Sequence, residues 1–168
     1  MNADIKILIA GLGNDLLTDD GVGVKIVNEL NSIHFGKNVV YKSSYFGGWE
    51  LLDLIEGYDL VLFIDAVIEK DRKTGSTGFH SLDSFKETLH LSHFHDSDFL
   101  TTISFGKMIS MKIPEHIFIY SIQIEEDKTF NRELSALLAQ RYEDIILEVK
   151  NVIIKLQSGI YDYEKIGI

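Results

Sequence analysis

The chain has 168 residues, which is enough for one domain with a sizeable core. Its formal net charge of -10 argues against DNA or RNA as a partner, because phosphate binding requires clustered lysines and arginines. The absence of cysteine excludes disulfides, thiolate zinc sites and a cysteine nucleophile. No signal peptide is visible after Met1, and the apolar runs are far shorter than the ~20 residues of a membrane helix, which predicts a cytoplasmic protein with no membrane partner.

The first half of the chain alternates apolar runs with loops and helical patterns. Ile5 to Ala10 is a β-branched apolar run that predicts a strand buried on both faces. The loop 11–20 follows, and then apolar residues recur at helical spacing from Val22 to Leu30, with Asp19 or Asp20 suited to the helix N-terminus. The remaining elements predicted here are a strand at Val39 to Lys42, a short helix at Trp49 to Ile55 and a strand at Leu60 to Ile64 that ends at Asp65.

The second half contains a histidine-rich segment without a regular pattern. Residues 69–78 predict a polar turn, and a strand is expected at Phe79 to Leu82. Residues 83–96 are irregular, and four histidines lie in or near them: His80, His90, His93 and His95. The elements predicted after this segment are a helix from about Asp98 to Ile109, a strand at Ile117 to Ile124, a long helix at Glu133 to Leu156 and a loose tail.

Strands and helices that alternate in this way predict a three-layer α/β fold with a mainly parallel sheet of about five strands flanked by helices. No repeat or linker divides the chain, so we expect a single domain over residues 1–157 and a tail over 158–168. In such sheets ligands bind beyond the carboxyl ends of the strands. Asp20 follows the first strand and Asp65 ends another, which places both on the functional edge.

Two other uses of this edge fit the sequence less well. The Gly11–Leu12–Gly13 turn is compatible with dinucleotide binding, but the fingerprint requires a third glycine where Leu16 stands. Asp19 and Asp20 with Asp65 are similar to the acidic pocket of a receiver domain. However, the whole segment 11–18 separates the acidic pair from the first strand, and no lysine follows the last strand.

A metal site is the better physical account of the acidic residues and histidines. Two carboxylates and an imidazole form a mixed oxygen and nitrogen set suited to zinc or nickel. Asp65 directly follows an apolar run, where an unpaired buried charge would be costly. Taken singly, Asp65 fits a turn cap equally well, Asp20 a helix cap and each histidine a surface role. Only the combination favours a metal, and periodicity does not select among the four histidines.

Several segments together resemble a known family. The segment 7–23, ILIAGLGNDLLTDDGVG, closely resembles the opening of [NiFe]-hydrogenase maturation endopeptidases, with a strand, G-x-G-N, a short L-L-x-D stretch and D/E-G-x-G. The first motif is highly specific. Supporting matches, over about residues 5 to 155 in total, are ELLD at 50–53, GYD at 57–59, FIDA at 63–66 and IQIE at 122–125.

The resemblance implies a twisted sheet flanked by helices and a defined activity. Such enzymes cut a C-terminal extension from the hydrogenase large-subunit precursor after nickel insertion, and an acidic residue, an Asp and a His contact the metal. On this chain the first two are Asp20 and Asp65. The nickel is expected to come with the precursor, and the resemblance leaves open whether the free enzyme holds zinc or another divalent metal.

The resemblance also suggests the histidine, and two positions depart from the family pattern. The family has a His in a Ser-containing turn before an apolar helix, which favours His95 and leaves His93 as the alternative. Ser43 stands where the family commonly has an Asp, so a hydroxyl replaces the carboxylate at that position. Asp20 replaces the Glu of some members and shortens the reach by one methylene.

These residues lead to a hypothesis for the reaction. Asp20, Asp65 and His95 are expected to read the nickel of the precursor, and a water activated by metal or carboxylate then attacks the peptide carbonyl. The amides of the Gly11, Gly13 and Asn14 loop are expected to position the substrate or stabilise the oxyanion. The alternative is a non-catalytic metal- or nucleotide-binding α/β domain.

Overall fold

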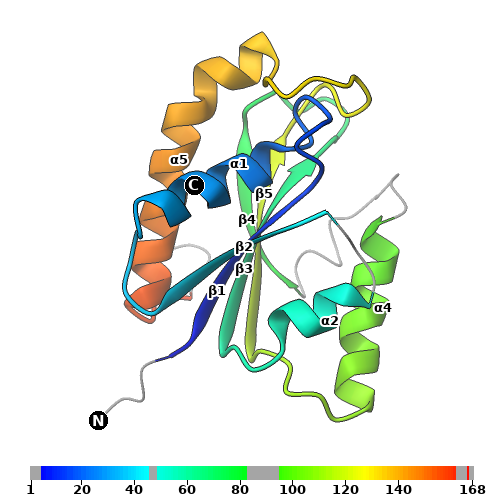
Figure 1. Cartoon of the computed structure of the whole chain (residues 1–168), viewed down its shortest axis with the longest axis vertical. Helices are drawn as coiled ribbons and strands as arrows, with labels where there is room; N and C mark the ends of the chain where they lie inside the picture. The colour runs from blue at the N-terminus through cyan, green and yellow to red at the C-terminus, as the bar shows by residue number, and fades with distance from the viewer. Residues whose placement is uncertain (1–4, 46–48, 83–94, 162–165, 167–168) are drawn as a thin grey trace.

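A five-stranded sheet forms the middle layer of the computed structural model, which describes residues 5–45, 49–82, 95–161 and 166 (Figure 1). The strand order is β2-β1-β3-β5-β4, and all neighbours are parallel except β4, which pairs antiparallel with β5. The fold class predicted from the sequence is therefore confirmed. The strands are β1 (Ile7–Leu12), β2 (Val39–Ser44), β3 (Leu60–Val67), β4 (Thr77–Ser81) and β5 (His116–Gln123).

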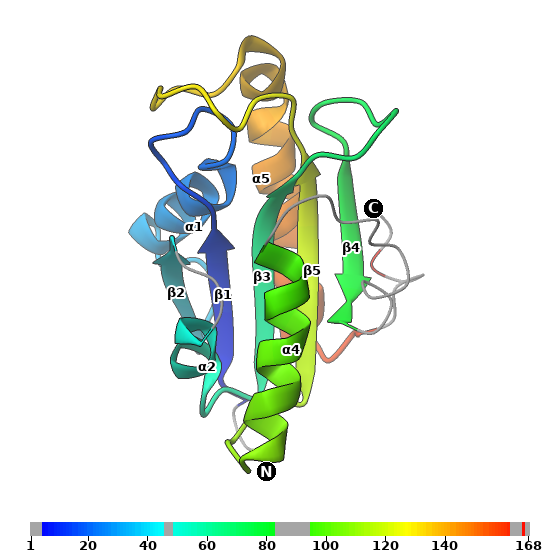
Figure 2. The same ribbon diagram turned by 90° about the vertical axis from the view of Figure 1, so that its right-hand side faces the viewer.

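Helices cover both faces of the sheet, as Figures 1 and 2 show. Helices α1 (Val22–Ser32) and α5 (Ala136–Gln157) pack on one face, and α2 (Glu50–Ile55) and α4 (His95–Met108) pack on the other. Two separate apolar clusters result, one on each side. The central strands are apolar at successive positions because both of their faces must be buried.

The alternation of side chains along β3 decides which face each residue occupies. Leu62 and Ile64 belong to the cluster under α1 and α5, whereas Val61 and Phe63 belong to the cluster under α2 and α4. Successive side chains of a strand point to opposite faces. Asp65 therefore lies on the face covered by α2 and α4.

The strands extend further than the apolar runs predicted. Gly11 pairs with both Ser43 and Ile64, so it belongs to β1 and not to the following loop. Asp65 pairs with Ser121 of β5 and lies inside β3, which continues to Val67. Both strands lengthen because neighbouring backbones supply hydrogen-bond partners for residues that are not themselves apolar.

The expected capping of α1 by Asp19 or Asp20 is wrong. The N-cap is Gly21, and no side chain caps the helix. Asp19 is fully buried, and its Oδ1 accepts a hydrogen bond of 2.7 Å from the Ser135 N–H, at the start of α5. A carboxylate at a helix N-terminus is favourable, but here Asp19 serves α5 and not its own helix.

Two of the described residues after α5, Tyr161 and Ile166, pack on the core, whereas Ser158 and Gly159 are exposed. Ile166 is 2% exposed, and its carbonyl oxygen accepts a 2.7 Å hydrogen bond from Lys155 Nζ. The ring of Tyr161 lies 4.3 Å from that of His116. Among the described residues, no helix combines the length and apolar character needed to cross a bilayer.

Candidate active site

Two glycines allow the start of α1 to pack directly on the ends of β1 and β3. A Cβ at Gly11 would lie only 2.9 Å from Val24 N and still nearer to Gly23 O. A Cβ at Gly23 would lie 2.9 Å from Leu12 O and nearer still to Ile64 O. These contacts are all with backbone atoms, so only glycine fits. The glycines of the first motif thus bring the loop that carries Asp20 close to the residue that precedes Asp65.

The loop backbone fixes the carboxylate of Asp20. The Asn14 N–H donates a 2.6 Å hydrogen bond to Asp20 Oδ2, and the Asp20 N–H donates to Leu17 O at 2.8 Å. Gly13 adopts φ 113°, where a Cβ would collide with Asp20 O. The Asn14 amide, which we expected to face the substrate, therefore holds the half-buried Asp20 instead.

Strand order places Asp20 and Asp65 at the topological switch point of the sheet. β1 pairs with β2 on one side and with β3 on the other, so the chain leaves β1 in one direction and returns on its opposite side. Open α/β sheets bind ligands at the carboxyl ends of the strands where the order reverses. Asp20 follows β1, and Asp65 lies near the end of β3. The structure thus brings these two predicted site residues to one edge.

The third predicted residue begins the helix that covers Asp65's face of the sheet. His95 is the first residue of α4, and Figure 2 shows this helix crossing β3 and β5 with its first turn toward the carboxyl ends of the strands. The side chains of residues 95–100 lie outside the described part of the structure, as do His90 and His93 entirely. The choice between His93 and His95 stays a prediction.

The described side chains by themselves do not complete a metal site. Within this set, no three His, Asp or Glu residues lie close enough to hold an ion. Asp20 and Asp65 supply two carboxylates, and an imidazole from the start of α4 would complete the mixed oxygen and nitrogen set that zinc and nickel accept. Ser43 is exposed on β2 beside Gly11, and it offers only a hydroxyl at this edge.

A second histidine lies on the same face of the sheet as Asp65. His80, on β4, places Nε2 3.2 Å from Ser121 Oγ. Burial lowers the pKa of His80, the positive charge of Arg72 lowers it further, and Glu69 acts in the opposite direction. The sequence contained His80 among four candidates, but no periodicity signal distinguished it, because the pairing of β4 with β5 is what brings its ring beside Ser121.

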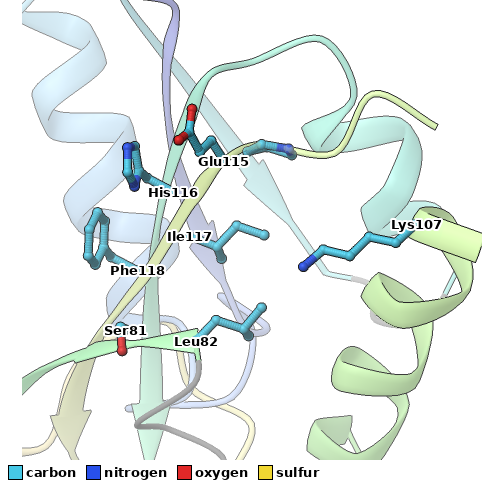
Figure 3. Close-up of a pocket in the computed structure, with 8 residues that line it drawn as sticks. Ser81, Leu82, Lys107, Glu115, His116, Ile117 and Phe118 are labelled. Atoms are coloured by element: carbon cyan, nitrogen blue, oxygen red, sulfur yellow. The ribbon is translucent and has the colours of Figure 1, made fainter. Parts of the chain in front are cut away.

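A hollow with a volume of about 190 Å³ lies at the other end of the sheet. Figure 3 shows the residues that line it. Its lining includes His116 and Lys107. His116 pairs with Leu60 at the beginning of both strands, five residues before the pair Asp65 and Ser121. This hollow therefore lies at the amino edge, and neither Asp20 nor Asp65 lines it.

Comparison with solved structures identifies the fold. The chain superimposes on the hydrogenase maturating endopeptidase HybD from E. coli with a TM-score of 0.73 and 23% identity, over 92% of this chain and 94% of that one. The chain has the fold of a hydrogenase maturation endopeptidase. The [NiFe] hydrogenase maturation protease HybD from Thermococcus kodakarensis gives a TM-score of 0.69 at 21% identity, over 88% of this chain and 99% of that one.

Sequence comparison confirms the resemblance to the maturation endopeptidases over part of the chain. The hydrogenase 2 maturation protease of Escherichia coli (strain K12) is 33% identical over 73 residues, which is 43% of this chain and 44% of that protein. The aligned region thus spans less than half of the curated relative. No protein-family model matches the chain.

Proposed function

We propose that this protein is an endopeptidase that removes a C-terminal extension from the large-subunit precursor of a [NiFe] hydrogenase after nickel insertion. The observation that supports the proposal is the place of Asp20 and Asp65 at one edge of the sheet, at the switch point of a maturation-endopeptidase fold. The named relatives are maturation proteases, which supports a peptidase acting on a hydrogenase precursor.

The donor set suits recognition of nickel that is part of the substrate. Asp20, Asp65 and His95 would present two carboxylates and an imidazole, and a divalent ion in the precursor would supply the charge that attracts them. A single carboxylate within reach of water is also able to act as a general base toward a nearby peptide carbonyl. Asp20 is held for this role by the Asn14 N–H, so its orientation does not depend on the substrate.

The test is a cleavage assay with Asp20→Asn and Asp65→Asn on nickel-loaded and nickel-free precursor, followed by mass spectrometry of the large subunit. Asparagine keeps an acceptor for the Asn14 N–H and removes the charge. We expect the wild-type protein to cut only the loaded precursor and both variants to lose cleavage while unfolding like the wild type. Normal cleavage by Asp20→Asn would refute the proposed role of the site.

Asp59→Asn is a matched control for this experiment. Asp59 Oδ2 also accepts a main-chain hydrogen bond, 2.9 Å from the Lys6 N–H, but it lies at the amino edge of the sheet beside Leu60. The control variant should therefore cut the precursor at the wild-type rate. A wild-type protein that binds nickel or a nucleotide without cutting any precursor would instead support the non-catalytic α/β domain.

The histidine is tested separately with His95→Ala and His93→Ala. If His95 is the third ligand, its loss abolishes cleavage and the loss of His93 has little effect. The reverse result assigns the role to His93. Full activity of both variants contradicts the participation of a histidine from the segment before α4.

A further inference from the structure

Three polar residues form a row across three neighbouring strands on the α4 face of the sheet. Asp65 of β3 pairs with Ser121 of β5, and Ser121 pairs with Gly78 of β4. Paired residues of adjacent strands point to the same face, and the strands lie only ~4.8 Å apart. His80, two residues after Gly78, shares that face. The order across the sheet is thus Asp65, Ser121 and His80.

The missing side chain of Gly78 makes room for the imidazole. A Cβ at Gly78 would lie 2.7 Å from His80 Nε2 and 2.8 Å from Ser121 Oγ. The ring of His80 therefore leans back over Gly78. Because β4 runs antiparallel to β5, this direction is toward the carboxyl end of β5, which is the edge that holds Asp65.

The buried hydroxyl of Ser121 links the ring to the position beside Asp65. Ser121 is 1% exposed, and a hydroxyl in such a place is costly unless it is hydrogen-bonded. Its described partners are His80 Nε2 at 3.2 Å and Gly78 O at 3.5 Å. The protonation of Nε2 decides where the hydroxyl hydrogen of Ser121 points. If Nε2 carries a hydrogen and donates it to Ser121 Oγ, the hydroxyl hydrogen is left for another acceptor. If Nε2 carries no hydrogen, Nε2 itself accepts the hydroxyl hydrogen.

We propose that His80 is a positioning residue of the processing site, which acts through Ser121 to orient the carboxylate of Asp65. This inference rests on the proposed function and deepens it. His80 touches neither substrate nor metal in this role. It sets the hydrogen-bonding state of the hydroxyl next to Asp65, and glycine at position 78 permits this contact, because a Cβ there would push the ring and the hydroxyl apart.

The kinetic test compares four variants on the nickel-loaded precursor. We expect His80→Ala to lower kcat by about 10-fold with a smaller change in KM, because a misdirected carboxylate affects the reaction more than docking. His80→Gln, which offers an amide near the position of Nε2, should recover most of the rate. Ser121→Ala should match His80→Ala, and the double variant should be no slower than either single one, because both changes break the same link.

His116→Ala and His116→Gln are the matched controls, since His116 is a histidine of the same sheet at its amino edge. Both should process the precursor like the wild type. Wild-type kcat for His80→Ala, no recovery with His80→Gln, or additive losses in the double variant would each overturn the inference.

A spectroscopic test separates this inference from the proposed function. The 15N chemical shifts of the His80 ring report which nitrogen carries the hydrogen, and they need no precursor. We expect Asp65→Asn to change these shifts and Asp59→Asn to leave them unchanged, with the Asp65 effect lost in the Ser121→Ala background. If Asp65→Asn leaves the shifts unchanged, the link is absent even when the wild-type protein cuts the precursor. If Asp65→Asn changes the His80 shifts but the wild-type protein cuts no precursor, the link between His80 and Asp65 is supported and the proposed protease function is refuted.

Discussion

Gly23→Ala tests the close contact of the start of α1 with the ends of β1 and β3. Gly23 is the second residue of α1, and helix propensity alone predicts that alanine there stabilises the protein by up to about 1 kcal/mol. The structure predicts the opposite sign. The new Cβ would meet three backbone atoms, namely Leu12 O at 2.9 Å, Ile64 C at 3.0 Å and Ile64 O at a still shorter distance.

The size of the effect follows from these distances. Ordinary van der Waals contact begins at 3.4 Å, so the start of α1 must retreat by about 0.5 Å from Leu12 O and by more from Ile64 O. Backbone atoms of two central strands do not give way as the end of a side chain does. We expect the overpacking to lower the free energy of unfolding by about 1–3 kcal/mol. The same shift moves Asp20 away from Asp65, and displacements of this order cost up to about 100-fold in rate.

Urea unfolding and the precursor cleavage assay measure the two effects on one sample. Gly106→Ala is the matched control, because Gly106 also lies in a helix, α4, and is buried. A Cβ there would meet Leu52 Cδ2 at 2.7 Å and Ile113 Cδ1 at 2.8 Å, which are the movable ends of side chains. The control should therefore change stability by less than about 1 kcal/mol and keep its processing rate.

The reasoning fails if Gly23→Ala is as stable as the wild type and processes the precursor normally. It also fails if the loss of rate disappears once the fraction of unfolded protein is taken into account. In that case the glycine would serve stability alone and would not set the distance between the aspartates.

Three further predictions concern the framework of the fold. Asp19→Ala should lower the free energy of unfolding in urea by about 1–3 kcal/mol, because it leaves the Ser135 N–H at the start of α5 without its 2.7 Å acceptor. An unchanged urea midpoint would contradict this. Burial raises the pKa of Tyr41 from its ordinary 10.0 to about 12, so the stability that the protonated phenol contributes below pH 10 is lost as the pH rises to 12. The free energy of unfolding, measured over this range, should therefore fall more steeply for the wild type than for Tyr41→Phe. Parallel curves for the two proteins would refute the assignment. Ile166→Ala should cost about 2–4 kcal/mol in thermal or urea unfolding if the tail belongs to the core, whereas a loose tail predicts no change.

Hydrophobic patterning was sufficient to predict the fold class and the existence of the described elements. Continuous apolar runs such as 60–64 arise because central parallel strands are buried on both faces. The local sequence of such a strand therefore shows directly that it is buried. The ends of the elements were less accurate. Asp65 lies within β3 because its backbone pairs with Ser121, and pairing of this kind depends on a strand more than fifty residues away.

The sequence by itself singled out Asp20 and Asp65 and their place after buried strands, because the carboxyl ends of parallel strands always share an edge. Only the tertiary structure decided that the edge they share is the switch point of the sheet. That result requires the strand order β2-β1-β3 and the close approach of Gly23 to Ile64, which no local pattern specifies. The place of His80 has the same origin. An antiparallel edge strand brings its ring beside Ser121, and sequence spacing carries no information about which strand will be its neighbour.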